Sequence, residues 1–131
     1  MNESNIEILI RLAAAKHGCT LFRNNVGVAY QGNSKRLSDG SIHIQNPRIL
    51  HAGLFKGSGD EIGYTPILIT SEMVGKHVAV FTSIEVKAGT KMSPDQITWL
   101  NTINSVGGIA GCVRSPEEMI QLLMQFKLKL I

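Results

Sequence analysis

Two carboxylates, a lysine and a glutamine stand where they could form one hydrolytic centre. Asp60 follows a Gly-rich stretch, Glu85 and Lys87 close an apolar run, and Gln96 lies near the start of an expected helix. Two carboxylates can share Mg²⁺ or Mn²⁺, and an ammonium beside a metal-bound water can orient or deprotonate that water or offset charge on a phosphate. The set therefore favours metal-dependent phosphodiester hydrolysis.

The alternation in HVAVFTSIEVK, residues 77–87, predicts a strand on which Glu85 and Lys87 point the same way. Each candidate also has a purely structural explanation. A lone Glu-x-Lys is more often a solvated pair worth under about 1 kcal/mol, and Asp60 is by default a turn residue. Gln96, three residues after Ser93, completes a capping box, which is compatible with reaching a metal-bound water. Only the joint pattern favours a site.

The other elements follow from periodicity and from turn residues. A helix is expected over 4–18, with Ile6, Leu9, Ile10 and Ala13 on one face, and Ser4 with Glu7 fits a capping box. The elements expected next are a strand over 20–30, a long loop over 31–48, a short strand after Asp60 and a hairpin turn at 72–76. The strand 77–87 is followed by a helix over 93–108 with Ile97, Leu100 and Ile103 inward and by a buried strand over 109–114. A last helix is expected from 115, although residues 126–131 fit an extended chain equally well. The order indicates an α/β fold.

Length and composition limit the class of protein. The chain has 131 residues, 44% of them hydrophobic, and a net charge of +3, which is typical of one globular domain and permits a nucleic-acid partner without requiring one. No apolar run approaches the ~20 residues of a membrane helix, and no secretory signal is visible, so a cytoplasmic protein with Cys19 and Cys112 reduced is expected.

The chain resembles, in order, the motifs of the PD-(D/E)XK nuclease superfamily and, within it, of the virus-type replication-repair nucleases, or VRR-NUC domains. The resembling segments are ESNIE, FRNNVG, GSGD, IEVK and SPDQITWLNTINSVGG. The family pattern has Pro before the first Asp, where this chain has Gly59. The resemblance implies one VRR-NUC domain over 1–131, with a central mixed β-sheet flanked by helices.

The resemblance also implies site residues and partners. Asp60, Glu85 and the Val86 carbonyl would hold Mg²⁺ or Mn²⁺, and Lys87 and Gln96 would position the attacking water. Glu3 matches the helix Glu of the family, and Glu7 lies one turn later on the same face. Stand-alone phage-type domains of this kind suggest a homodimer that cuts branched DNA such as four-way junctions, in the host cytoplasm, with no organic cofactor and no membrane.

Further residues are assigned less specific roles. Arg23, Asn24, Asn25 and Lys56 are predicted to contact DNA, although an Asn pair before Val-Gly is as often an ordinary turn. Trp99 is expected in the core, and the histidines and cysteines show no zinc-site spacing. The dimer surface is expected on the terminal helix, at Met119, Leu122, Leu123 and Phe126, or on the long loop. Two alternatives stay open, a catalytically silent DNA-binding or assembly module and a general nickase without junction preference.

Overall fold

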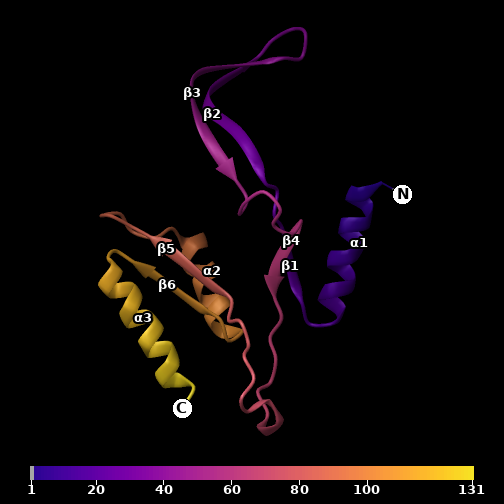
Figure 1. Ribbon diagram of the computed structural model, residues 1–131. Coiled ribbons are helices and arrows are strands. Elements are labelled where there is room, and N and C mark those ends of the chain that lie inside the picture. The colour runs from indigo at the N-terminus through magenta and orange to yellow at the C-terminus, as the bar shows by residue number, and fades with distance from the viewer. Residues whose placement is uncertain (1) are drawn as a thin grey trace. The chain divides into compact units, whose positions relative to one another are not determined.

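The computed structural model describes residues 2–131 and shows a mixed α/β chain with three α-helices (Figure 1). Its strands pair in three two-stranded sheets. The sequence predicted one central mixed sheet, and the described strands do not form it. The chain divides into two compact units, Met1–Tyr64 and Thr65–Ile131, which are described separately. None of the helices over 2–131 is both long and apolar enough to cross a membrane.

The first unit contains helix α1, Glu3–Lys16, and the antiparallel strands β1, Thr20–Arg23, and β4, Glu61–Tyr64. The side chain of Asn2 caps α1 by accepting from the backbone N–H of Asn5 at 2.9 Å. The expected capping box of Ser4 and Glu7 is therefore wrong, because both residues lie inside the helix.

The face of α1 that packs in this unit is also different from the expected one. Glu7, Arg11 and Ala14 are half-buried, whereas Ile6, Leu9, Ile10 and Ala13 are exposed. Two ion pairs explain the orientation, because Arg11 bonds Glu61 at 2.7 Å and Glu7 pairs with Arg23 at 2.9 Å. Charged side chains, rather than the apolar stripe, face β1 and β4.

The region expected as a long loop is a β-hairpin. Strand β2, Gly27–Arg36, pairs antiparallel with β3, Ile42–Ala52, around a turn at 37–41. Almost every residue of both strands is exposed. The Gly, Asn and Pro residues that predicted a loop lie at a bulge, where the register shifts between Gln31 and Asn33. We call this hairpin, residues 27–52, the ribbon.

Between β4 and β5 the chain has little regular structure. The expected hairpin turn at 72–76 is instead a 3-10 helix, Ser71–Met73, and the strand expected from His77 begins only at Thr82. The apolar residues before it, including Val78 and Val80, are exposed. Hydrophobic alternation alone therefore overestimated the length of this strand.

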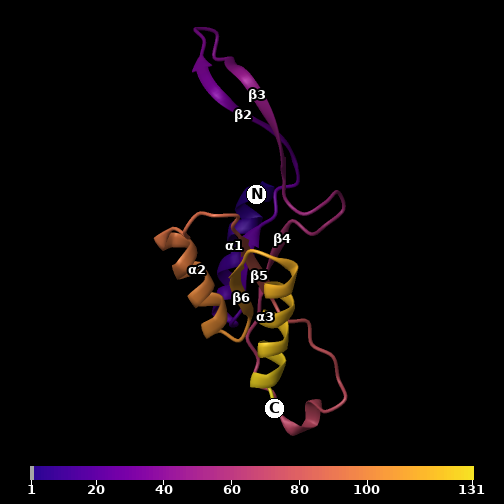
Figure 2. The same cartoon turned by 90° about the vertical axis from the view of Figure 1, so that its left-hand side faces the viewer.

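The second unit is a β-α-β arrangement with a further helix. Strand β5, Thr82–Val86, pairs parallel with β6, Ile109–Val113, through the connecting helix α2, Pro94–Ser105. Helix α3, Pro116–Lys129, follows. The two strands lie between α2 and α3 (Figure 2). Gly111 allows the α3 side to approach closely, since a Cβ there would lie 2.9 Å from the Leu122 side chain.

The buried hydrophobic side chains of the described residues lie in this second unit. Leu100 and Ile103 from α2 and Ile109, Ala110 and Val113 from β6 form its core, as the sequence predicts for both segments. Ile97, expected inward, is exposed. Helix α3 continues to Lys129, so the helical alternative for the end of the chain is the one adopted.

Candidate functional site

The carboxylate of Glu85 is the centre of a polar cluster on the α2 side of strand β5. Lys87 Nζ lies 3.2 Å from Glu85 Oε1, and Gln96 Nε2 donates to the same oxygen at 2.7 Å. The shared direction of Glu85 and Lys87, predicted from the strand period, is confirmed by this contact. Both side chains are partly covered, with 29% of Glu85 and 18% of Lys87 exposed. The pair is therefore more enclosed than an ordinary surface pair.

Gln96 connects the start of α2 to this carboxylate. Its Oε1 accepts from the backbone N–H of Ser93 at 2.8 Å, while the backbone N–H of Gln96 donates to Ser93 Oγ at 3.2 Å. The predicted capping box is confirmed. Because the amide oxygen is occupied by the cap, only the amide nitrogen is directed at Glu85. Gln96 thus fixes the carboxylate to a rigid helix start.

One residue pair next to Glu85 was not identified from the sequence. Trp99 Nε1 donates to Ser83 Oγ at 2.8 Å, one turn further along α2 and two residues earlier on β5. The Trp99 ring also meets the Phe81 ring edge-on at 6.5 Å between centroids. Trp99 packs against the strand as a half-buried residue, whereas the sequence predicted it in the core. The i, i+3 spacing of Gln96 and Trp99, matched to the i, i+2 spacing of Ser83 and Glu85, is the signal that could have predicted both contacts.

Parallel pairing holds the end of β5 in place. Glu85 lies opposite Cys112, and the backbone N–H of Lys87 donates to the Val113 carbonyl at 3.2 Å. Val86 has its side chain 74% exposed, on the strand face opposite Glu85. Cys112 is half-buried and free. The carboxylate and ammonium therefore project from a backbone that is paired along one edge, with β6.

Asp60 lies in the other unit, at the end of a corner that a buried asparagine organises. Asn24 is only 6% exposed, and its side-chain amide donates to Ser58 Oγ at 2.7 Å and to the Gly59 carbonyl at 2.8 Å. Its oxygen accepts from the backbone N–H of Leu54 at 3.0 Å. The backbone N–H of Asn24 donates to the Asp60 carbonyl. The Asp60 side chain is exposed and accepts no hydrogen bond from residues 2–131 in the structure.

The two acidic residues of α1 differ in environment. Glu3 is exposed in the first turn of the helix, while Glu7 is half-buried and paired with Arg23. Glu7 Oε2 is buried, and its contact with Arg23 Nη2 at 2.9 Å is an ion pair without hydrogen-bond geometry, whereas Glu61 Oε2 is buried with neither kind of partner in the described chain. Of the two helix acids that the resemblance offers, Glu7 is the one that packs against the strands of its own unit.

The residues predicted to contact DNA have unequal access to a ligand. Asn25 and Lys56 are exposed, and Arg23 is exposed although it pairs with Glu7. Asn24 is buried, and its amide is occupied by the corner just described. Asn24 therefore has a structural role in place of the predicted DNA contact. The sequence left open that the Asn pair forms an ordinary turn, and this alternative fits Asn24. The assignment of the other three stays a prediction.

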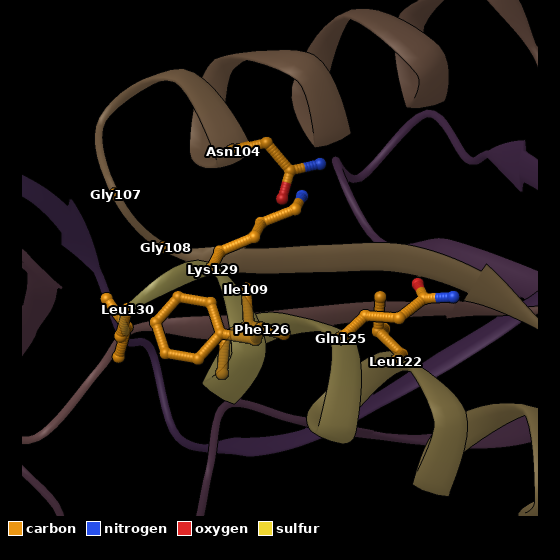
Figure 3. A pocket seen from close by; sticks show the side chains of 9 residues that line it. All are labelled: Asn104, Gly107, Gly108, Ile109, Leu122, Gln125, Phe126, Lys129 and Leu130. Carbon is orange, nitrogen blue, oxygen red and sulfur yellow. The ribbon is translucent and has the colours of Figure 1, made fainter.

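A hollow in the second unit lies away from the Glu85 cluster. It has a volume of about 240 Å³ and is lined by the end of α2, the start of β6 and α3 (Figure 3). Ile109, Leu122 and Phe126 make it largely apolar, and Lys129 is its single charged residue. The Asn104 amide in its wall is already bonded to the backbone of Ala110. This cavity has no carboxylate and does not include the Glu85 cluster.

Comparisons with known proteins leave the family open. No protein-family model matches the chain, and no curated protein or solved structure is significantly similar to it.

Proposed function

We propose that the chain is a metal-dependent DNA endonuclease with a PD-(D/E)XK fold of the VRR-NUC type, and that Glu85 and Lys87 are the centre of its active site. The observation that carries the proposal is the contact of Glu85 with both Lys87 and Gln96 on one helix-covered strand face. A solvated Glu-x-Lys pair does not need a glutamine from a neighbouring helix to fix its carboxylate. A carboxylate that binds a metal ion in one orientation does need such a supporting hydrogen bond.

The residues present fit a hard divalent cation. Both contacts to Glu85 fall on Oε1, and Oε2 accepts no hydrogen bond from the described residues. The carboxylate of Asp60 is similarly available. Among residues 2–131 no three His, Cys, Asp or Glu side chains gather as a cage, and Mg²⁺ usually needs only one or two carboxylates because it retains several waters. Glu85 would hold Mg²⁺ or Mn²⁺, and the resemblance alone adds the Val86 carbonyl, Asp60 and, through water, Glu3 to the same ion.

The chemistry divides between the metal and three side chains. A bound divalent ion polarises the scissile phosphate and lowers the pKa of a bound water. Glu85 would bind the ion, and Gln96 holds the carboxylate in place through Oε1. The Lys87 ammonium, held within 3.2 Å of that carboxylate, orients the attacking water and offsets the negative charge that develops on the phosphate.

A metal-titrated nicking assay tests this proposal. Supercoiled plasmid is incubated with the purified protein in Mg²⁺, Mn²⁺, Ca²⁺ or EDTA. Nicking in Mg²⁺ and Mn²⁺, and none in EDTA, is expected. Ca²⁺ should support DNA binding without hydrolysis. Binding without nicking in every metal would favour the alternative of a silent DNA-binding or assembly module.

The choice of substrate and the assembly are a second part of the proposal and rest on the resemblance. Resolving a four-way junction needs two nicks, and one chain offers one Glu85 centre, so the active unit for that reaction is a two-fold dimer. Helix α3 offers a surface for it. Met119, Leu122 and Phe126 are half-buried, and a second set of apolar side chains on the same helix is exposed, namely Ile120, Leu123, Met124 and Leu128.

Sedimentation at micromolar concentration, together with cleavage of a junction and of a matched linear duplex, tests the assembly. A dimer that prefers the junction is expected. A monomer that cuts both substrates equally would leave a general nickase as the function.

A further inference from the structure

We infer that the ribbon, residues 27–52, is a DNA-binding arm that lies in a groove of the duplex and contacts its phosphates. The inference rests on the proposed function for the identity of the partner. It goes further by assigning the DNA contacts to a segment that the sequence predicts as a loop, and to residues other than those predicted to contact DNA.

The ribbon has no packing partner within its own unit. Its two strands contact each other, and neither contacts α1, β1 or β4. Isolated two-stranded hairpins are marginally stable in water. A ribbon of two strands of 10 and 11 residues, exposed on both faces, is therefore expected to be completed by a ligand or a partner.

The charges on the ribbon favour a polyanion. It carries Lys35, Arg36 and Arg48, and its single acidic residue is Asp39 in the turn. None of these three cations belongs to an ion pair among the described residues. Asp39 is occupied by the turn, since its carboxylate accepts from the backbone N–H and hydroxyl of Ser41.

The strand register gathers polar donors near the turn. Lys35 lies directly opposite His43, and the next pair on the same face is Asn33 and Gln45. The Lys35 ammonium and an N–H of the His43 imidazole can both donate to an anion that lies between them. Amide, ammonium and imidazole groups on one face match what phosphates and base edges require.

The shape of the ribbon agrees with its charge. A two-stranded β-ribbon fits the major groove, which is about 12 Å wide, and a ten-residue strand extends about 30 Å. A Cβ at Gly32 would lie 2.7 Å from the Gln45 carbonyl, and Asn46 has a φ of 50°, so both residues form the bulge. Bulges increase the right-handed twist of a pair of strands. Figure 1 shows the ribbon as a twisted pair of this kind.

The test compares two variants of the intact chain that remove lysine or arginine from different places. Lys35→Ala/Arg36→Ala/Arg48→Ala removes the ribbon cations. The control, Lys127→Ala/Lys129→Ala, removes cations from the last turn of α3. Binding of each to a linear duplex and to a four-way junction is measured by fluorescence anisotropy in Ca²⁺ over a KCl series. Circular dichroism confirms that each variant is folded.

The ribbon variant should bind at least tenfold more weakly than wild-type at 100 mM KCl. Its plot of log affinity against log salt should be shallower by about 2 to 3, because each lost phosphate contact contributes about 0.9. The control should stay within about threefold of wild-type with an unchanged slope. Equal effects of the two variants, or a ribbon variant with wild-type affinity and slope, would overturn the inference.

A second copy of this chain is the other occupant that the test addresses. If the ribbon variant changed the sedimentation coefficient and bound DNA normally, the ribbon would be a protein interface and the inference would be wrong. The outcomes are separate from those of the nuclease proposal. DNA binding through the ribbon without nicking in any metal would contradict the nuclease and leave this inference intact.

Discussion

Substituting Gln96 with Ala should separate two roles that this side chain combines. The amide oxygen caps α2 through the Ser93 N–H at 2.8 Å, and the amide nitrogen holds Glu85 Oε1 at 2.7 Å. Removing the side chain breaks one capping hydrogen bond at the start of α2. It also breaks the hydrogen bond that joins the Glu85 carboxylate to α2. Lys87 would then be the remaining contact of Glu85 among the described residues.

The expected loss of stability follows from these two bonds. The cap bond is solvent-exposed, so its loss costs about 0.5 kcal/mol, at the low end for helix caps. The bond to the carboxylate is charge-assisted, but Glu85 is 29% exposed, which reduces its contribution to about 1 kcal/mol. The free energy of unfolding should therefore fall by about 1 to 2 kcal/mol. Such a loss leaves the chain folded.

The loss of activity should be larger than the loss of stability implies. A carboxylate that is no longer held by α2 should bind Mg²⁺ more weakly, and removing a side chain that orients a metal ligand typically costs 10- to 100-fold in metal affinity or activity. Plasmid nicking across a Mg²⁺ titration measures this. Ser93→Ala is the matched control, because it removes the other half of the cap and leaves Glu85 bonded. Equal nicking and Mg²⁺ dependence for Gln96→Ala and wild-type would refute the positioning role.

Three further outcomes are expected. Lys87→Met keeps the aliphatic stem and removes the charge, so nicking should stop while the free energy of unfolding falls by no more than about 1 kcal/mol; nicking near the wild-type rate would return the pair to surface decoration. Asn24→Ala should cost about 2 to 3 kcal/mol in urea unfolding because it leaves the backbone N–H of Leu54 and the Gly59 carbonyl unpaired, whereas the exposed Asn25→Ala should change stability by under about 0.5 kcal/mol. The pKa of Asp39 lies below its usual value of 3.8 because Ser41 donates to the ionised carboxylate. The stabilisation of the turn by this contact is therefore complete above pH 3.8 and is lost as the pH falls through the lowered pKa. An NMR titration of Asp39 should find its midpoint below 3.8.

Local patterns predicted the part of the second unit from Thr82 onward well, apart from the exposed Ile97. The capping box at Ser93, the inward Leu100 and Ile103, the buried strand 109–113 and the shared direction of Glu85 and Lys87 all follow from short-range periodicity and capping chemistry. These features are set within one or two turns of the chain. They need no knowledge of distant segments.

The first unit was predicted less well because distant ion pairs decide its packing. Arg11 is 50 residues from Glu61, and their bond rotates α1 so that its apolar stripe is exposed. Amphipathic periodicity contains no information about such a partner. The buried Asn24 has the same cause, since it bonds residues 30 to 35 positions later.

The ribbon was missed for a different reason. Its strands bury neither face, so they lack the alternation of apolar and polar residues by which strands are recognised. Gly32, Asn33 and Pro47 added loop signals in its centre, where the bulge lies. A hairpin that is exposed on both faces has a composition close to that of a loop.

The nicking rate of Glu85→Gln at saturating Mg²⁺ tests the central claim most directly. Gln is nearly the same size but has no anionic oxygen for a cation, so nicking should fall by at least a hundredfold while the melting temperature stays close to wild-type. Glu117→Gln, at an exposed position of α3 without a bonded partner among residues 2–131, removes the same charge and should nick at the wild-type rate. A Glu85→Gln variant that nicks as fast as Glu117→Gln would contradict a metal-dependent nuclease centred on Glu85 and Lys87.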